Sequence, residues 1–309
     1  MILNTGSRTD IPAFYSSWFC NRIHEGFLYV RNPYYPRLVT RFELDPKTVD
    51  VIVFCTKNPG PALDRINELD AFRQLWYVTI TPYGKDIEPN VPNKHQVIEY
   101  FQKLSLHNSA KRMIWRYDPI FINEKYTIEY HIRAFETIAS KLEGYCDRVV
   151  FSFIDLYEKT KRNFPEVREV SFEDQIILTK AFARSASRHH MILTSCLESK
   201  ELALYGADTN GCMTKEIIEE AIGEQLNIPK GSNAREGCNC LLGNDIGAYN
   251  TCAHFCRYCY ANYDREIVIR NMKHHDPDSP LLIGHIEKDD IIRDAKQISN
   301  INHQLRLEL

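Results

Sequence analysis

Three cysteines late in the chain have a spacing that suits iron chemistry. They lie in the cysteine loop, residues 252–261, which reads Cys252-Ala-His-Phe-Cys256-Arg-Tyr-Cys259-Tyr-Ala. Such a C-x3-C-x2-C loop can bind three irons of a [4Fe–4S] cluster and leave the fourth iron open for an exogenous ligand. We expect His254, inside the loop, to support the cysteines rather than to bind iron.

The same residues admit a second interpretation, a structural zinc site. Cys256 and Cys259 form one C-x2-C pair, and Cys238 with Cys240 could supply the second pair that tetrahedral zinc requires. The x3 spacing from Cys252 to Cys256 has no use in such a zinc knuckle. The pattern therefore favours the cluster.

The loop CAHFCRYCYA resembles the cluster loop of radical S-adenosylmethionine (SAM) enzymes. Its ending is similar to that of the branch containing spore photoproduct lyase, and the whole chain resembles a bacterial domain-of-unknown-function family with this loop at its C-terminal end. The resemblance implies SAM chelated by the open iron, reductive cleavage of SAM, hydrogen abstraction from a substrate, and an electron donor such as flavodoxin or ferredoxin. Radical SAM enzymes usually carry the loop after the first barrel strand, whereas here it begins at residue 252 of 309.

The resemblance also implies three catalytic candidates outside the loop. Thr56-Lys57 is similar to a Thr-Lys or Ser-Lys pair whose lysine lies near the SAM carboxylate. A solvent-facing lysine in a loop would give the same sequence pattern. Arg116 could bind a carboxylate and Asp118 the ribose hydroxyls. A structural ion pair between Arg116 and Asp118 is the alternative. Tyr258, before the last cysteine, is a further candidate for cofactor contact.

A second metal site is expected from four other cysteines. Cys196, Cys212, Cys238 and Cys240 are the full complement for a second [4Fe–4S] cluster or a closed zinc site. Alternatively, only Cys238 and Cys240 bind metal, and Cys196 and Cys212 are buried as small apolar groups. Three scattered cysteines fit packing in the core: Cys20, Cys55 and Cys146.

Composition excludes several classes of protein. The chain has 309 residues, 44% hydrophobic and 26% charged, with ten cysteines and a net charge of −3. No run of apolar residues is long enough for a transmembrane helix, and residues 1–10 do not resemble a secretory signal. Cysteine-rich chains of this kind belong in a reducing compartment, so we expect a cytoplasmic protein. A nucleic-acid partner is not indicated by the charge.

Alternating strand and helix patterns predict how these residues are positioned. Strands are expected at 2–5, 27–30, 51–54, 76–80, 113–116, 149–153 and 191–195. Helices are expected at 14–24, 92–106, 126–142, 172–189 and 214–226. Such βα units predict a parallel sheet, and polar residues at nearly every strand end favour a complete or partial TIM-like (β/α) barrel with a site at those ends. Asp10 also suits the N-cap of a helix.

We therefore expect two parts, a barrel over residues 1–205 and a cysteine-rich segment over residues 206–309 with a surface helix at 289–309. The predicted function is that of a radical SAM enzyme with a second metal site. Two other classes stay open. One is a hydrolase or isomerase on a zinc-stapled barrel without redox chemistry, and the other is a cysteine-rich module that binds a partner or nucleic acid.

Overall fold

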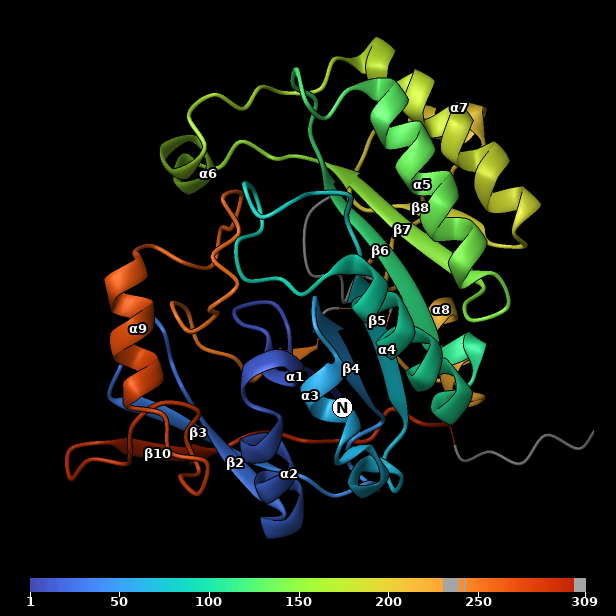
Figure 1. Ribbon diagram of the computed structural model, residues 1–309. Coiled ribbons are helices and arrows are strands. Elements are labelled where there is room, and N and C mark those ends of the chain that lie inside the picture. The colour runs from blue at the N-terminus through green and yellow to red at the C-terminus, as the bar shows by residue number, and fades with distance from the viewer. Residues whose placement is uncertain (230–238, 242, 303–309) are drawn as a thin grey trace, which may run out of the picture.

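The computed structural model describes residues 1–229, 239–241 and 243–302, built around one large parallel sheet (Figure 1). Its strand order is β8-β7-β6-β5-β4-β1-β9, and all described neighbours pair in parallel. The predicted α/β class with a parallel sheet is confirmed. β8 and β9 are its two edges, so the described strands leave the sheet open. The strands are β1 (Ile2–Asn4), β4 (Val51–Thr56), β5 (Gln74–Thr79), β6 (Met113–Ile120), β7 (Arg148–Phe153), β8 (Ile192–Ser195) and β9 (Asn244–Asp245).

Helices between the strands cover one face of the sheet, where α4, α5 and α7 lie side by side (Figure 1). The five helices predicted between residues 14 and 226 are present, and four of them start at capping residues whose side chains accept a backbone N–H: Asn93, Thr127, Ser171 and Thr214. The helices are α1 (Ile11–Phe14), α2 (Ser16–Glu25), α3 (Gly60–Leu63), α4 (Lys94–Asn108), α5 (Ile128–Leu142), α6 (Glu158–Asn163), α7 (Phe172–Arg188), α8 (Lys215–Ile222) and α9 (Arg265–Lys273). Short 3-10 turns occupy Ile66–Leu69, Ala110–Arg112 and Lys200–Tyr205.

The period of two along each strand divides the interior into two cores. On β4, Ile52 and Phe54 point toward the helices, and the ring of Phe54 stacks on that of Trp76 with centroids 4.0 Å apart. The alternate residues Val51 and Val53 belong to a second core on the opposite face. Because a strand sends successive side chains to opposite faces, both faces of this sheet are apolar over most of their length.

A helix covers part of the second face. Ile217, Ile218 and Ile222 of α8 are buried in the same cluster as Leu75 and Ile114 of the sheet. The apolar residues on this face give way to polar and sulfur-containing residues toward the carboxyl ends of the strands. The change in residue type marks where a site can form.

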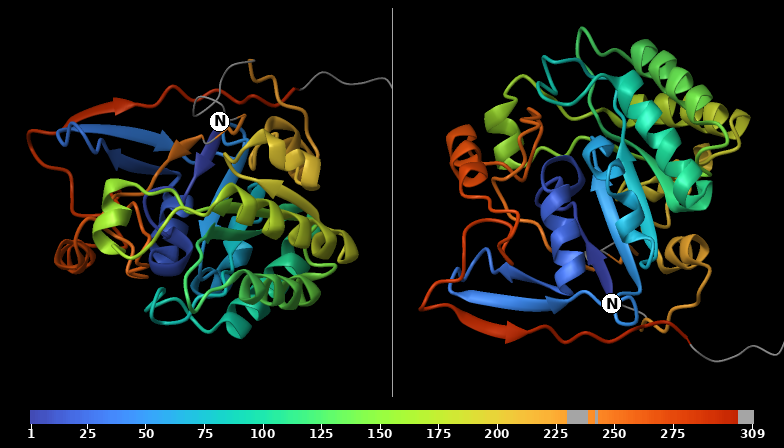
Figure 2. Two further views of the ribbon diagram at one scale, coloured as in Figure 1. Left: turned by 90° about the horizontal axis from the view of Figure 1, so that it is seen from above. Right: turned by 60° about the horizontal axis from the view of Figure 1, so that its bottom comes forward.

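A separate three-stranded sheet has the order β10-β3-β2. β2 (Phe27–Arg31) pairs antiparallel with β3 (Leu38–Glu43), and β10 (Ile291–Asp294) pairs in parallel with β3 (Figure 2). The strand expected at 27–30 is thus present, but it belongs to this sheet because a short connection to β3 makes a hairpin. The surface helix predicted over 289–309 is wrong at β10, where backbone pairing with β3 overrides the polar composition; residues 303–309 lie outside the described residues.

Residues beyond 205 contribute to both sheets. β9 pairs with β1, and β10 joins β3, so late residues pair with early ones. The boundary expected near residue 205 stays a prediction. No helix in the part of the chain that the structure describes is both long and apolar enough to cross a membrane.

A buried histidine makes stability depend on pH. His131 is fully buried, and its ring nitrogens contact the Tyr117 hydroxyl and the Phe121 carbonyl, each at 2.9 Å. Burial lowers the pKa of His131 to about 4, and the bond to Phe121 offsets this only in part. The folded state therefore favours the neutral ring. Its contribution is complete above the unfolded pKa of about 6.5 and is lost as pH falls toward 4.

We predict that the difference in unfolding free energy between wild type and His131→Gln narrows by about 2 kcal/mol from pH 7 to pH 4.5. Urea denaturation at both pH values measures it. The control is His95→Gln, which changes an exposed residue of α4 and should leave the free energy of unfolding nearly unchanged. A difference in unfolding free energy between wild type and His131→Gln that is the same at both pH values would contradict the prediction.

Candidate functional site

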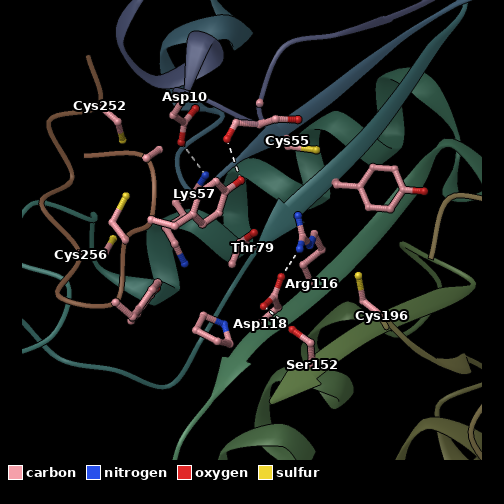
Figure 3. Close-up of a pocket in the computed structure, with 18 of the residues that line it drawn as sticks. Asp10, Cys55, Lys57, Thr79, Arg116, Asp118, Ser152, Cys196, Cys252 and Cys256 are labelled. Atoms are coloured by element: carbon pink, nitrogen blue, oxygen red, sulfur yellow. Dashed lines mark hydrogen bonds and ion pairs between the residues drawn. The ribbon is translucent and has the colours of Figure 1, made fainter. Parts of the chain in front are cut away.

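A cavity of about 420 Å³ lies over the carboxyl ends of the parallel strands (Figure 3). Cys55 of β4 and Thr79 of β5 line it, as do Arg116 and Asp118 of β6 and Ser152 of β7. The alternation of the strands places these residues on the face that bears the second core. Open α/β sheets bind their ligands outside the carboxyl ends of the strands, so this is the candidate site.

The cysteine loop lies at this cavity. Cys252, Cys256 and Cys259 all line it, and Figure 3 shows Cys252 and Cys256 on the side of Asp10 and Lys57. Burial raises the pKa of all three thiols above its ordinary value. A bound metal would reverse this preference, because a coordinating thiol is deprotonated.

A single metal ion would require several side chains to point at one centre. Among the described residues, no three His, Cys, Asp or Glu side chains are arranged to hold a single metal ion. A zinc site needs such convergence, whereas the thiolates of a cluster can each bind a different iron. The zinc knuckle considered above includes Cys238, which lies outside the described residues.

Lys57 lies at the end of β4 and lines the cavity. Its Nζ donates a hydrogen bond of 2.9 Å to Glu88 Oε1, and Glu88 also accepts from Lys94, Thr81 and Tyr258. Burial alone would lower the pKa of Lys57, but Glu88 and nearby Cys256 raise it above its ordinary value. Burial would likewise raise the pKa of Glu88, and the two lysines instead hold it well below its usual range. The network is therefore charged at neutral pH.

Arg116 and Asp118 form an ion pair on the cavity wall. Asp118 Oδ1 also accepts a 2.5 Å hydrogen bond from Ser152 Oγ. Arg116 Nε is buried without a hydrogen-bond partner in the described structure. The ion pair expected as the alternative to a SAM contact is present, and one donor of Arg116 is left for a ligand.

Three further cysteines form the second cysteine group, Cys196, Cys212 and Cys240, on the cavity wall. Cys212 Sγ lies 3.1 Å from Cys196 Sγ and 3.5 Å from Cys240 Sγ. The backbone N–H groups of Cys212 and Met213 donate to Cys240 Sγ at 3.2 and 3.3 Å. Gly211 permits this approach, because its φ is +127° and a Cβ there would lie 3.3 Å from Cys240 Sγ.

The family to which the chain belongs is shown by its sequence. A family model described as a domain of unknown function, DUF1848, matches residues 2–261. The chain belongs to this family. The match runs from β1 through the last residue of the cysteine loop, so in this DUF1848 member it includes both the large sheet and the three loop cysteines. No curated protein matches the chain.

The structure brings the predicted site residues together at one cavity. Ten of the eleven line it: Lys57, Arg116, Asp118, Cys196, Cys212, Cys240, Cys252, Cys256, Tyr258 and Cys259. Cys238 lies outside the described residues. Their roles stay predictions, but residues up to about 200 positions apart in the sequence share one site.

Other residues of the site were missed or assigned differently. Cys55 was expected in the core, yet it lines the cavity because it shares a face with Val51 and Val53. Glu88 carried no signal in the sequence, since it lies in a loop without a motif. Asp10 caps α1 as expected, accepting from Ala13 N at 3.1 Å, but it has further partners in the cysteine loop and at the end of β4.

We predict that Arg116→Met lowers the free energy of unfolding by about 2 kcal/mol, because Asp118 would stay largely buried without its partner. Urea denaturation at neutral pH measures the change. The matched control is Arg73→Met, which removes a more exposed ion pair to Glu224 and should cost less than about 1 kcal/mol. Equal losses for the two variants would contradict the prediction.

Proposed function

We propose that this protein is a radical SAM enzyme in which Cys252, Cys256 and Cys259 hold a [4Fe–4S] cluster beside a SAM site in the cavity. The main support is that three cysteines with cluster-loop spacing line a cavity at the carboxyl ends of parallel strands. The open parallel sheet is compatible with an incomplete TIM-like (β/α) barrel, which we propose as the fold of residues 1–205.

Unpaired buried groups at the cavity fit a polar ligand. Thr9 Oγ1, Arg116 Nε and His254 Nδ1 are buried without hydrogen-bond partners in the described structure, and all three residues line the cavity. Each unpaired buried group costs about 1–3 kcal/mol. SAM has a carboxylate, an amino group and ribose hydroxyls that could satisfy such groups.

The charge of the site is also compatible with a bound SAM molecule. Lys57 and Lys94 share the single carboxylate of Glu88, so this buried network has one positive charge in excess. The excess charge favours nearby anions, namely the thiolate of Cys259, whose pKa Lys57 lowers against the effect of burial, and the carboxylate of SAM. In this proposal Lys57 holds the SAM carboxylate, while Arg116, Asp118 and Tyr258 are further contacts.

When bound, the cluster would supply the electron that cleaves SAM and starts radical chemistry on a substrate. A donor such as flavodoxin or ferredoxin would provide that electron. The chain itself limits water at the reacting centre, because Phe153, Ile154 and Met213 line part of the cavity. The described cysteines form no disulfide, which is compatible with the reducing cytoplasm that we propose as the location.

We also propose a second metal site at Cys196, Cys212 and Cys240, completed by Cys238 or by a bound molecule. The support is the short distances between the sulfurs and the two N–H groups that donate to Cys240 Sγ, since such bonds stabilise a thiolate. Four thiolates would suit a second [4Fe–4S] cluster or zinc, but zinc would require the described sulfurs to move toward one centre, because no three of the described side chains are arranged to hold a single ion.

We predict that protein purified without oxygen is brown and contains at least about four irons per chain. Cys256→Ala should abolish reductive SAM cleavage and remove about one cluster, because a loop ligand is lost. Iron analysis and detection of 5′-deoxyadenosine measure these outcomes. The control is Cys146→Ala, which changes a cysteine buried in the core and should keep both properties. Colourless protein that binds only zinc would overturn the proposed function.

We predict that Cys212→Ala reduces the metal content by one site while the electron paramagnetic resonance signal of the reduced loop cluster, and its change on adding SAM, persist. Metal analysis distinguishes iron from zinc at the second site. A metal content equal to that of wild type would show that the second cysteine group binds no metal.

A further inference from the structure

Two buried carboxylates attach the cysteine loop to the rest of the site. Asp10, at the N-cap of α1, is 5% exposed, and Glu88, in the loop before α4, is 1% exposed. We call them the anchoring carboxylates. They come from segments far from residues 252–261 in the sequence; Asp10 lines the cavity, whereas Glu88 was not singled out in the sequence.

Asp10 joins three segments of the chain. Its Oδ1 accepts from Ala13 N at 3.1 Å, which caps α1. Its Oδ2 accepts from the backbone N–H of Lys57 at 2.8 Å and from His254 Nε2 at 2.9 Å. One carboxylate oxygen therefore binds the end of β4 to the first half of the cysteine loop.

Glu88 makes the corresponding connection at the second half of the loop. Its carboxylate accepts from the hydroxyl of Tyr258, which lies between Cys256 and Cys259, and from Lys57 Nζ. Lys94 Nζ donates to its other oxygen. Both anchoring carboxylates thus meet at Lys57, one at its backbone and the other at its side chain.

Two further hydrogen bonds, both to backbone carbonyl groups, support the same attachment. The side-chain amide of Asn90 donates to the Ala253 carbonyl at 2.7 Å, and Arg257 N donates to the Ile87 carbonyl at 3.0 Å. These bonds flank Glu88 and run along the loop. The segment 87–90 is therefore the surface against which the cysteine loop lies.

From these contacts we infer that Asp10 and Glu88 are positioning residues, which hold His254 and Tyr258 against Lys57 and so fix the cysteines at the cavity. The role assigned to the loop rests on the proposed function, whereas the attachment itself is independent of any metal. A carboxylate in each position accepts several N–H or O–H groups at once, and a neutral amide cannot do so without presenting its own donors.

The variants Asp10→Asn and Glu88→Gln test the inference. Asparagine keeps the cap of α1 but turns a donor toward Lys57 N. Glutamine leaves two lysines without their counter-charge. Tyr258→Phe is the mildest variant, since it removes only the hydroxyl that Glu88 accepts from. The matched control is Asp86→Asn, two residues from Glu88, whose carboxylate bonds to Tyr126 and Lys125 and not to the cysteine loop.

Hydrogen–deuterium exchange of the metal-free protein is the main measurement. We expect the amides of residues 252–261 to exchange at least about tenfold faster in Asp10→Asn and Glu88→Gln, because bonds to charged groups are lost. Tyr258→Phe should give a smaller acceleration in the same peptides. Asp86→Asn should change them less than about twofold, and peptides of α5 and α7 should be unaffected in all variants.

Iron bound after anaerobic reconstitution is the second measurement, and we expect it to fall at least twofold in the same two variants. Unchanged exchange of residues 252–261 in the two carboxylate variants would overturn the inference. If circular dichroism shows that either carboxylate variant does not fold, the exchange of residues 252–261 in Tyr258→Phe tests the inference instead. Wild-type protein that binds no iron would overturn the proposed function alone, because the exchange result does not depend on metal.

Discussion

The end of β4 is the fixed point of the site. β4 pairs with β1 up to Val53 and with β5 up to Thr56, so its last residues cannot shift without breaking backbone hydrogen bonds to β5. Lys57 follows directly and is held through its backbone N–H and its ammonium group. Every group bonded to Lys57 therefore acquires a position set by the sheet. Loops rarely have such support, and it explains how a segment without helix or strand can present three cysteines to one cavity.

The two faces of the sheet have different tasks. The face under α4, α5 and α7 is filled with aromatic and aliphatic side chains and holds the sheet in shape. The other face is apolar where α8 and neighbouring residues cover it, and toward the strand ends it carries Cys55, Thr79 and Arg116. Because successive side chains of a strand point to opposite faces, a site on one face can vary in chemistry without disturbing the packing on the other.

Much of this arrangement was predictable from the sequence, for identifiable reasons. The apolar runs and helix caps that produce β4–β8, α4, α5, α7 and α8 are local patterns, and the cysteine spacing is a local motif. Two edge strands, β9 and β10, were not predictable, because β9 is two residues long and β10 has exposed side chains, so pairing alone defines them. Glu88 was missed for a similar reason, since its importance comes from four donors that only the folded chain brings to it.

The late position of the cysteine loop has a consequence for biosynthesis. Ribosomes release the N-terminal part of a chain first, at roughly 5–20 residues per second. Strands β1 to β8 end at Ser195, so most of the large sheet can form before residues 252–261 emerge. The loop then closes over strand ends that already exist. Any prosthetic group held there would be inserted after translation into a largely finished framework, and would not serve as the nucleus around which the framework forms.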